Sequence, residues 1–228
     1  MIQYNPNLFL FSLHIPKSGG TSLTEVLKKW FWPGFHAHYF RHEENKMPFE
    51  PRKVKLFAHS IGIFPLCIHG HFEEEADVFT CYPKAKQFIT FLRDPLEMHI
   101  SLFFDHQRRL RDEGALYWKG EKVSIDYEDL DEWIEKRPFF LLHFMPWSVS
   151  SENYLDVINK NFIHVGITEN LQKSVDIMAQ KLGKKTVNIP HLNTSKRSQK
   201  PSTTSINVFK KKYALEYSIY EYACSINS

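Results

Sequence analysis

The sequence predicts an α/β fold in which a mainly parallel sheet is flanked by helices. Apolar runs of strand length alternate along the chain with segments of helical period, and a glycine-rich loop separates the first such run from the first helix. The 228 residues are 43% hydrophobic and 24% charged, which is enough apolar surface to order the whole chain. We therefore expect a single domain over residues 1–228.

The first strand is predicted at residues 8–15, a nearly continuous apolar run that suits a central strand covered on both faces. After the pair Gly19–Gly20, Thr21 and Ser22 are expected to cap a helix. The apolar residues of that helix recur with helical spacing at Leu23, Val26, Leu27, Trp30 and Phe31.

Three further strands are predicted in the middle of the chain, at residues 54–59, 66–71 and 87–92. The last of these has the strongest signal. The dipeptide Asp94–Pro95 then supplies an N-cap and a first-turn proline for a helix that runs to about Arg111.

The last third of the chain repeats the alternation. Ser150 or Ser151 is expected to cap a helix that ends at Asn159, and residues 162–167 are expected to form a strand. A helix should open at Thr168 and close at Gly183, with one apolar face formed by Leu171, Val175, Met178 and Leu182. The final helix should bury a stripe of Ile206, Phe209, Tyr213, Tyr217, Tyr220 and Cys224.

Charge and cysteine content exclude several classes of protein. A net charge of +3 is too small to indicate a nucleic-acid partner. No apolar run approaches the ~20 residues that a bilayer span needs, so we expect no stable membrane insertion and a cytoplasmic location. Cys67, Cys81 and Cys224 are an odd number with no short-range pairing, which is typical of thiols in a reducing compartment.

One long segment near the C-terminus is basic. Residues 177–215 contain no acidic residue, yet they hold several lysines and Arg197. Lys210, Lys211 and Lys212 are consistent with a solvated helix face. The irregular stretch at residues 183–204 is long for a loop within one domain, and we expect it to close over an anionic ligand.

The clearest chemical signal is the nonapeptide at residues 14–22, between the first strand and the first helix. Backbone N–H groups converge at such a junction with the positive end of the helix dipole, so it suits an oxyanion. Glycines allow close backbone approach, lysine adds a charge, and hydroxyls donate hydrogen bonds. The residues concerned are Lys17, Ser18, Gly19, Gly20, Thr21 and Ser22.

This nonapeptide is not a Walker A motif, because Lys17 precedes both glycines. It closely resembles the 5′-phosphosulfate loop of the carbohydrate sulfotransferases, the family that includes heparan sulfate 2-O-sulfotransferase. That resemblance implies a P-loop-like, sulfotransferase-type sheet and the sulfuryl donor 3′-phosphoadenosine 5′-phosphosulfate (PAPS). A nucleotide kinase or NTPase, or a non-catalytic nucleotide-binding module, is the alternative.

A second match is Arg93, followed eight residues later by Ser101, which resembles the family's 3′-phosphate site. Arg93 is also a candidate from position alone, because open α/β sheets bind ligands at the carboxyl ends of their strands and the guanidinium fork suits phosphate. The role of Ser101 is implied by the resemblance only. Asp94 could instead be a magnesium ligand at a Walker B-like strand, although Pro95 favours an N-cap.

A third match is His69–Gly70–His71, which resembles the His-Gly-His of heparan 2-O-sulfotransferases and places the catalytic base at His71. A histidine is also the obvious group to take a proton from an alcohol at neutral pH. Two alternatives stay open, namely structural histidines and a zinc site. The zinc ligands would come from His36, His38, His59, His69 and His71, and a substitute base could come from Glu73, Glu74 or Glu75.

Two more segments resemble the family. Residues 165–169 resemble its strand-to-helix junction, and residues 192–197 resemble the loop that closes over the nucleotide. The nucleotide-contacting residues of that loop would be Asn193, Thr194, Ser195, Lys196 and Arg197. Residues 32–64 and 112–148 match no known pattern, and we expect them to bind the acceptor.

The resemblance implies a PAPS-dependent O-sulfotransferase that acts on a hydroxyl of a carbohydrate or glycolipid. His71 would remove the hydroxyl proton, and Lys17 would stabilise charge on the leaving phosphate. This chemistry requires no metal.

Overall fold

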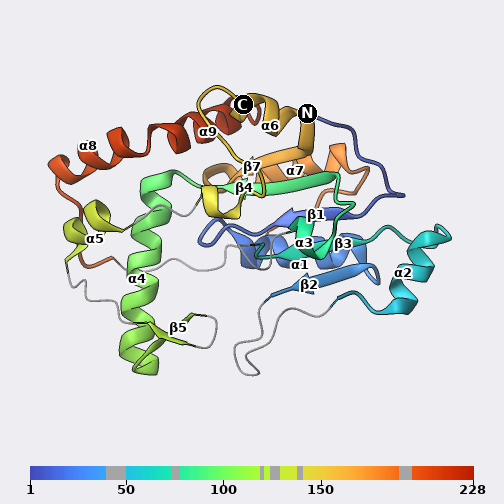
Figure 1. The fold of residues 1–228 in the computed structure, drawn as a ribbon, viewed down its shortest axis with the longest axis horizontal. Coiled ribbons are helices and arrows are strands. Elements are labelled where there is room, and N and C mark those ends of the chain that lie inside the picture. The colour runs from blue at the N-terminus through green and yellow to red at the C-terminus, as the bar shows by residue number, and fades with distance from the viewer. Residues whose placement is uncertain (40–49, 73–77, 119–120, 124–128, 138–140, 190–196) are drawn as a thin grey trace.

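The computed structural model describes residues 1–39, 50–72, 78–118, 121–123, 129–137, 141–189 and 197–228. Five parallel strands form its main sheet, in the spatial order β2-β3-β1-β4-β7 (Figure 1). Their bounds are β1 Leu10–Leu13, β2 Phe35–His38, β3 Cys67–Gly70, β4 Gln87–Leu92 and β7 Phe162–Ile167. A separate antiparallel pair is formed by β5 Leu116–Trp118 and β6 Glu121–Val123.

Helices cover both faces of the parallel sheet, which confirms the predicted α/β class. On one face, α1 (Gly20–Phe31) and α7 (Leu171–Lys181) pack on Leu10, Cys67 and Ile89 of the strands. The opposite face carries α4 (Pro95–Glu113), α6 (Tyr154–Asn161), α8 (Thr203–Lys212) and α9 (Ala214–Ser225).

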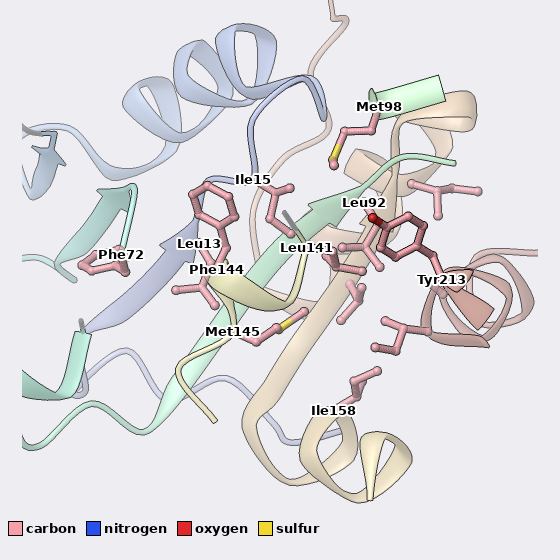
Figure 2. Packing of buried hydrophobic residues seen from close by; sticks show 14 of the residues in the cluster. Leu13, Ile15, Phe72, Leu92, Met98, Leu141, Phe144, Met145, Ile158 and Tyr213 are labelled. Atoms are coloured by element: carbon pink, nitrogen blue, oxygen red, sulfur yellow. The ribbon is translucent and has the colours of Figure 1, made fainter. Parts of the chain in front are cut away.

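The larger core lies on the α4 and α9 side of the sheet. Figure 2 shows Leu13 and Leu92 from neighbouring strands packed with Phe144, Met145 and Tyr213, which come from later parts of the chain. Strand side chains alternate between the two faces, and β1, β3, β4 and β7 are buried on both, as the continuous apolar runs predict, whereas the edge strand β2 exposes Ala37. Short helices α2 (Lys53–Ser60), α3 (Val78–Cys81) and α5 (Leu130–Lys136), with the 3-10 helices η3 (Leu142–Phe144) and η4 (Thr168–Asn170), complete the described secondary structure.

The direction of the strand order reverses between β1 and β4. From β1 the chain passes through α1 to β2 on one side of the sheet, whereas from β4 it leads to β7 on the other. Ligands of open α/β sheets bind at such a switch point. The loop after β1 and the residue after β4, Arg93, both lie there.

Several predicted elements differ in the structure. Residues 54–59 form helix α2, not a strand, because an apolar run this short does not by itself distinguish the two. The N-cap of α1 is Gly19, in a left-handed conformation, so that Thr21 and Ser22 lie inside the helix and do not cap it. The final helix breaks at Tyr213 into α8 and α9.

The helix before β7 also starts later than predicted. It begins at Tyr154 with Asn153 as N-cap, and the amide of Ser150 donates to the Asn153 side chain, so the serines form the preceding turn. Strand β2 was not predicted, since four residues that include two histidines give no strand signal. By contrast, the Asp94 carboxylate accepts a hydrogen bond from the Glu97 amide at 2.9 Å, which confirms its N-cap role.

The three cysteines are free thiols, as their number and spacing predict. Among the described residues, no helix combines the length and the apolar character that crossing a membrane requires.

Buried histidines make the fold sensitive to acid. Burial lowers the pKa of His164, on β7, to about 3, and the charge of Lys181 acts in the same direction. The unfolded chain, whose histidines titrate near 6.5, therefore binds more protons than the native state between these values. Stability should fall as the pH drops from about 6.5 toward 3.

We predict that His164→Leu makes the pH dependence of the unfolding free energy shallower by up to about 1.4 kcal/mol per pH unit between about pH 6 and 4. Urea denaturation over this range measures the slope. His143→Gln, at an exposed position, is the matched control and should keep the wild-type slope. Equal slopes in all three proteins would contradict the prediction.

Candidate functional site

The loop at residues 14–22 lies between β1 and α1, beside the end of β3. The amide of His14 donates to the carbonyl of Gly70 at 2.8 Å, which extends the pairing of β1 with β3 by one residue. Two residues then adopt left-handed conformations, Lys17 with φ 62° and Gly19 with φ 76°. Left-handed residues that alternate with other conformations turn backbone N–H groups toward one concave surface. This arrangement binds anions.

Ser18 lies between these two left-handed residues. Its side chain is 2% exposed, and its hydroxyl has no hydrogen-bond partner among the described residues. A buried hydroxyl without a partner is unfavourable by roughly 1–3 kcal/mol, so native proteins rarely leave one unless a ligand completes it. No acidic residue occupies the first turn of α1. Both observations indicate an anion site at this helix N-terminus.

The second glycine of the pair is needed to make room for His14. A Cβ on Gly20 would overlap the His14 imidazole ring. The two glycines of the loop therefore serve different purposes: Gly19 allows a left-handed backbone, and Gly20 allows a side chain to approach.

Three imidazole rings stack beside the loop. The ring of His14 lies between those of His71, at a centroid distance of 4.4 Å, and His69, at 5.2 Å. The Tyr39 hydroxyl lies 2.8 Å from Nδ1 of His14. Burial lowers the pKa of His14 well below its usual value, and the neighbouring His71 and His69 lower it further. His14 is therefore neutral at physiological pH.

His71 is partly exposed and has a defined tautomer. Its Nδ1 lies 2.7 Å from the backbone oxygen of His14. Because a carbonyl oxygen can only accept, Nδ1 carries the hydrogen in this contact, and Nε2 is the basic nitrogen of the ring. The ring of Phe144 lies 5.7 Å away. A partly exposed imidazole with its orientation fixed has the properties of a general base.

His69 is buried and structural. Its Nδ1 lies 2.9 Å from the Ser12 hydroxyl and its Nε2 lies 3.0 Å from the Thr24 hydroxyl, so both ring nitrogens are engaged. Burial lowers its pKa to about 3. Between the two histidines, a Cβ on Gly70 would overlap the backbone of His38 in β2. The glycine thus lets the edge strand pack closely.

Lys17 contacts two neighbours of the loop, helix α4 and Arg93, the residue after β4. Its Nζ lies 3.4 Å from Asp105 on α4, and its backbone oxygen accepts a hydrogen bond from Arg93 at 3.3 Å. Asp105 also forms ion pairs with Arg108 and Arg109. Burial acts to raise the pKa of the Asp105 carboxyl, but the Arg108 hydrogen bond and the surrounding cations outweigh it and leave the pKa lowered. Asp105 is thus the counter-ion of Lys17.

Glu97 contacts Arg197 and Arg93, two arginines that were predicted to bind the nucleotide. Arg197 donates to both of its carboxylate oxygens, at 3.2 and 2.6 Å, and Arg93 lies 3.5 Å from one of them. The Arg197 hydrogen bond is the main reason that the pKa of Glu97 is lowered. Ser101, which is buried, follows Glu97 by one helical turn, so both residues face the same side of α4.

Not every predicted residue can be placed. Asn193, Thr194, Ser195 and Lys196 lie outside the described residues, as do Glu73, Glu74 and Glu75. Thr21 is exposed and Ser22 is buried in the first turn of α1. Within the described part of the chain, no cluster of three or more His, Cys, Asp or Glu side chains suits a metal ion. His59 lies apart on α2, where its ring contacts the Phe64 carbonyl.

Four residues of the site were not singled out from the sequence. His14 was part of the motif, but nothing showed that its ring would stack on His71. Tyr39 comes from a segment without a recognisable pattern. Glu97 and Asp105 could have been found by helical spacing, since with Ser101 they recur every four residues along α4.

Comparison with known proteins finds similar solved structures and no matching family model. No family model matches the chain, and no curated protein matches it. One similar solved structure is mouse sulfotransferase SULT7A1 complexed with PAP, with 16% identity and a TM-score of 0.45 over 94% of this chain and 66% of that one. Another is retinol dehydratase in a complex with retinol and PAP, with 12% identity and a TM-score of 0.36 over 80% and 61%. The chain spans less than two thirds of either structure's length, and at these scores the likeness carries no functional argument.

The packing of His14 on Gly20 generates a prediction about stability. Gly20→Ala should lower the unfolding free energy by roughly 1–3 kcal/mol, because the added methyl overlaps the His14 ring. In a His14→Ala background, Gly20→Ala should change the unfolding free energy little, because the imidazole ring is absent. Urea denaturation of the two single variants and the double variant gives the coupling energy. An unchanged cost of Gly20→Ala in the two backgrounds would show that the ring is not the obstacle.

Proposed function

We propose that this protein is a PAPS-dependent sulfotransferase that transfers a sulfuryl group to a hydroxyl of a carbohydrate or glycolipid acceptor. The observation that carries the proposal is the buried, unpartnered hydroxyl of Ser18 in a loop that also presents Lys17 and borders His71. An anion-binding loop with a histidine base at its edge suits transfer of an anionic group to an alcohol.

Two groups of cations suit a donor that carries phosphate at both its 5′ and 3′ positions. The loop would hold the 5′-phosphosulfate through Lys17, Ser18, Gly19, Gly20, Thr21 and Ser22. Arg93, Ser101 and Arg197 would hold the 3′-phosphate, with Asn193, Thr194, Ser195 and Lys196 closing over the nucleotide. Asp105 and Glu97 neutralise Lys17 and the two arginines when no donor is bound, and a bound donor would take over that role.

In the reaction, Nε2 of His71 would remove the proton of the acceptor hydroxyl as its oxygen attacks sulfur. The bond between sulfur and the bridging oxygen breaks, and adenosine 3′,5′-bisphosphate leaves. Lys17 and the loop N–H groups would stabilise the negative charge that develops on that oxygen. The hydrogen bond from His71 Nδ1 to the His14 carbonyl would support the imidazolium that forms.

The acceptor class is supported by the residues around the base. Tyr39 and Phe144 lie against His71, and they come from the two segments that match no known pattern, residues 32–64 and 112–148. Aromatic rings with a polar group at one edge suit a ligand that has both apolar faces and hydroxyls, as sugars do.

Arg93 should distinguish nucleotides by their 3′-phosphate. Arg93→Ala removes a charge-assisted pair, so the affinity for adenosine 3′,5′-bisphosphate should fall about ten- to a hundred-fold more than the affinity for AMP. Isothermal titration calorimetry measures both. Arg111→Ala, at an exposed arginine near the C-terminal end of α4, is the control and should bind both nucleotides normally. Equal losses for the two nucleotides in Arg93→Ala would contradict the assignment.

His71 should be needed for turnover and not for donor binding. We expect His71→Ala to reduce sulfuryl transfer from PAPS by about 10²- to 10⁴-fold, the usual share of general acid–base catalysis, while donor affinity stays nearly constant. In the His71→Ala variant, the rising limb of the pH–rate profile should also disappear. Lys160→Ala, at an exposed residue of α6 outside the proposed site, is the control and should behave as wild type. Full turnover in His71→Ala would exclude His71 as the base, and the proposal would then require another base.

A further inference from the structure

We propose that helix α2 and the turn after it dock on the surface of an anionic lipid bilayer. The docking surface consists of four apolar side chains that point away from the protein, with exposed fractions of 68% for Val54, 64% for Phe57, 55% for Ile61 and 66% for Ile63. Val54, Phe57 and Ile61 recur with helical spacing along one face of α2. This surface is separate from the proposed donor site.

The outward direction of this face is fixed by contacts on the other side of the helix. Ala58 and His59 are buried, and the ring of His59 packs on Phe9 with centroids 4.9 Å apart. Lys55 donates to the backbone oxygen of Phe35, at the start of β2. The opposite face of α2 is therefore attached to the sheet, and the apolar face cannot turn inward without breaking these contacts.

The turn after α2 holds the fourth apolar residue in place. The amide of Gly62 donates to the His59 carbonyl, and the amide of Ile63 donates to the Ala58 carbonyl, which together form a Schellman motif with Gly62 at φ 75°. Ile63 is thereby held against the end of α2.

The charges around this surface favour an anionic partner. Arg52 and Lys53 are exposed at the start of α2, and no acidic residue occurs between residues 51 and 72. Cations at a helix N-terminus are unfavourable for the helix dipole, and the first turn of α2 holds no acidic side chain to offset them. The negative charge of phosphatidylserine-type headgroups would neutralise the positive charges of Arg52 and Lys53.

The size of the surface favours a bilayer over a second protein. The surface has four exposed apolar residues, whereas each partner in a standard protein interface contributes roughly 20–30 residues. An eight-residue helix is about 12 Å long, which is too short to span the ~30 Å hydrocarbon core but suits a helix that lies in the headgroup region. The inferred association is therefore peripheral.

The position of α2 would leave the donor site accessible. Figure 1 shows α2 at the end of the molecule opposite α4, and Lys55 contacts the first residue of β2. The phosphate loop lies at the other, carboxyl, end of the strands. A protein docked through α2 would keep its donor site turned away from the bilayer.

Sedimentation with vesicles tests the inference, using phosphatidylcholine alone and phosphatidylcholine mixed with phosphatidylserine. We expect the protein to bind the mixed vesicles more tightly. The double variant Phe57→Ser/Ile61→Ser should weaken binding at least tenfold, and Arg52→Gln/Lys53→Gln should weaken it roughly 30-fold at low salt. Val208→Ser and Lys210→Gln/Lys211→Gln, which alter exposed residues of α8, are matched controls and should bind as wild type.

Each other outcome would overturn the inference. If the wild-type protein binds neither kind of vesicle, lipid docking is excluded. If the variants of the docking surface bind vesicles as tightly as the control variants do, the contact with the bilayer lies elsewhere on the protein. A concentration-dependent dimer that Phe57→Ser/Ile61→Ser abolishes in sedimentation velocity would identify a second copy as the occupant. Circular dichroism and thermal unfolding confirm that the variants, which change only exposed side chains, remain folded.

Discussion

The backbone of His14 joins the two chemical functions of the site. Its amide donates to Gly70 and extends the pairing of β1 with β3, while its carbonyl accepts from the His71 ring and selects the tautomer. Because β1 and β3 are parallel and in register, their carboxyl ends place the phosphate loop and the histidine side by side. A shift of one residue in this register would separate the proposed anion site from His71, the proposed base.

The remaining parts of the site depend on this junction. The ring of His14 fills the space over Gly20, stacks on His71 and meets Tyr39, so one side chain links the helix, the base and the following segment. On the other side of β1, Arg93 contacts the loop through the Lys17 carbonyl. Two carboxylates on α4, Glu97 and Asp105, hold the cations in position. Contacts within the protein therefore hold these described residues of the site in position.

Local patterns predicted the elements that carry strong local signals. The buried strands, the glycine-containing loop between β1 and α1 and the Asp94 cap could be predicted, because continuous apolar runs, paired glycines and an Asp-Pro pair are specific local signals. Helix α2 and strand β2 could not, since residues 54–59 are too few to show a period and their apolar face points outward. Contacts between elements far apart in the sequence, such as Lys17 in the loop after β1 with Asp105 on α4, leave no trace in local sequence.

The central claim is that the loop and Arg93 bind a nucleotide with a 3′-phosphate, and calorimetry tests it most directly. Adenosine 3′,5′-bisphosphate, ATP and GTP would each be titrated into the protein with and without Mg²⁺. The account predicts that the bisphosphate binds more tightly than either triphosphate and that Mg²⁺ does not alter its affinity. Tight, Mg²⁺-dependent binding of ATP or GTP with no affinity for the bisphosphate would contradict it and identify the protein as a nucleotide kinase or NTPase.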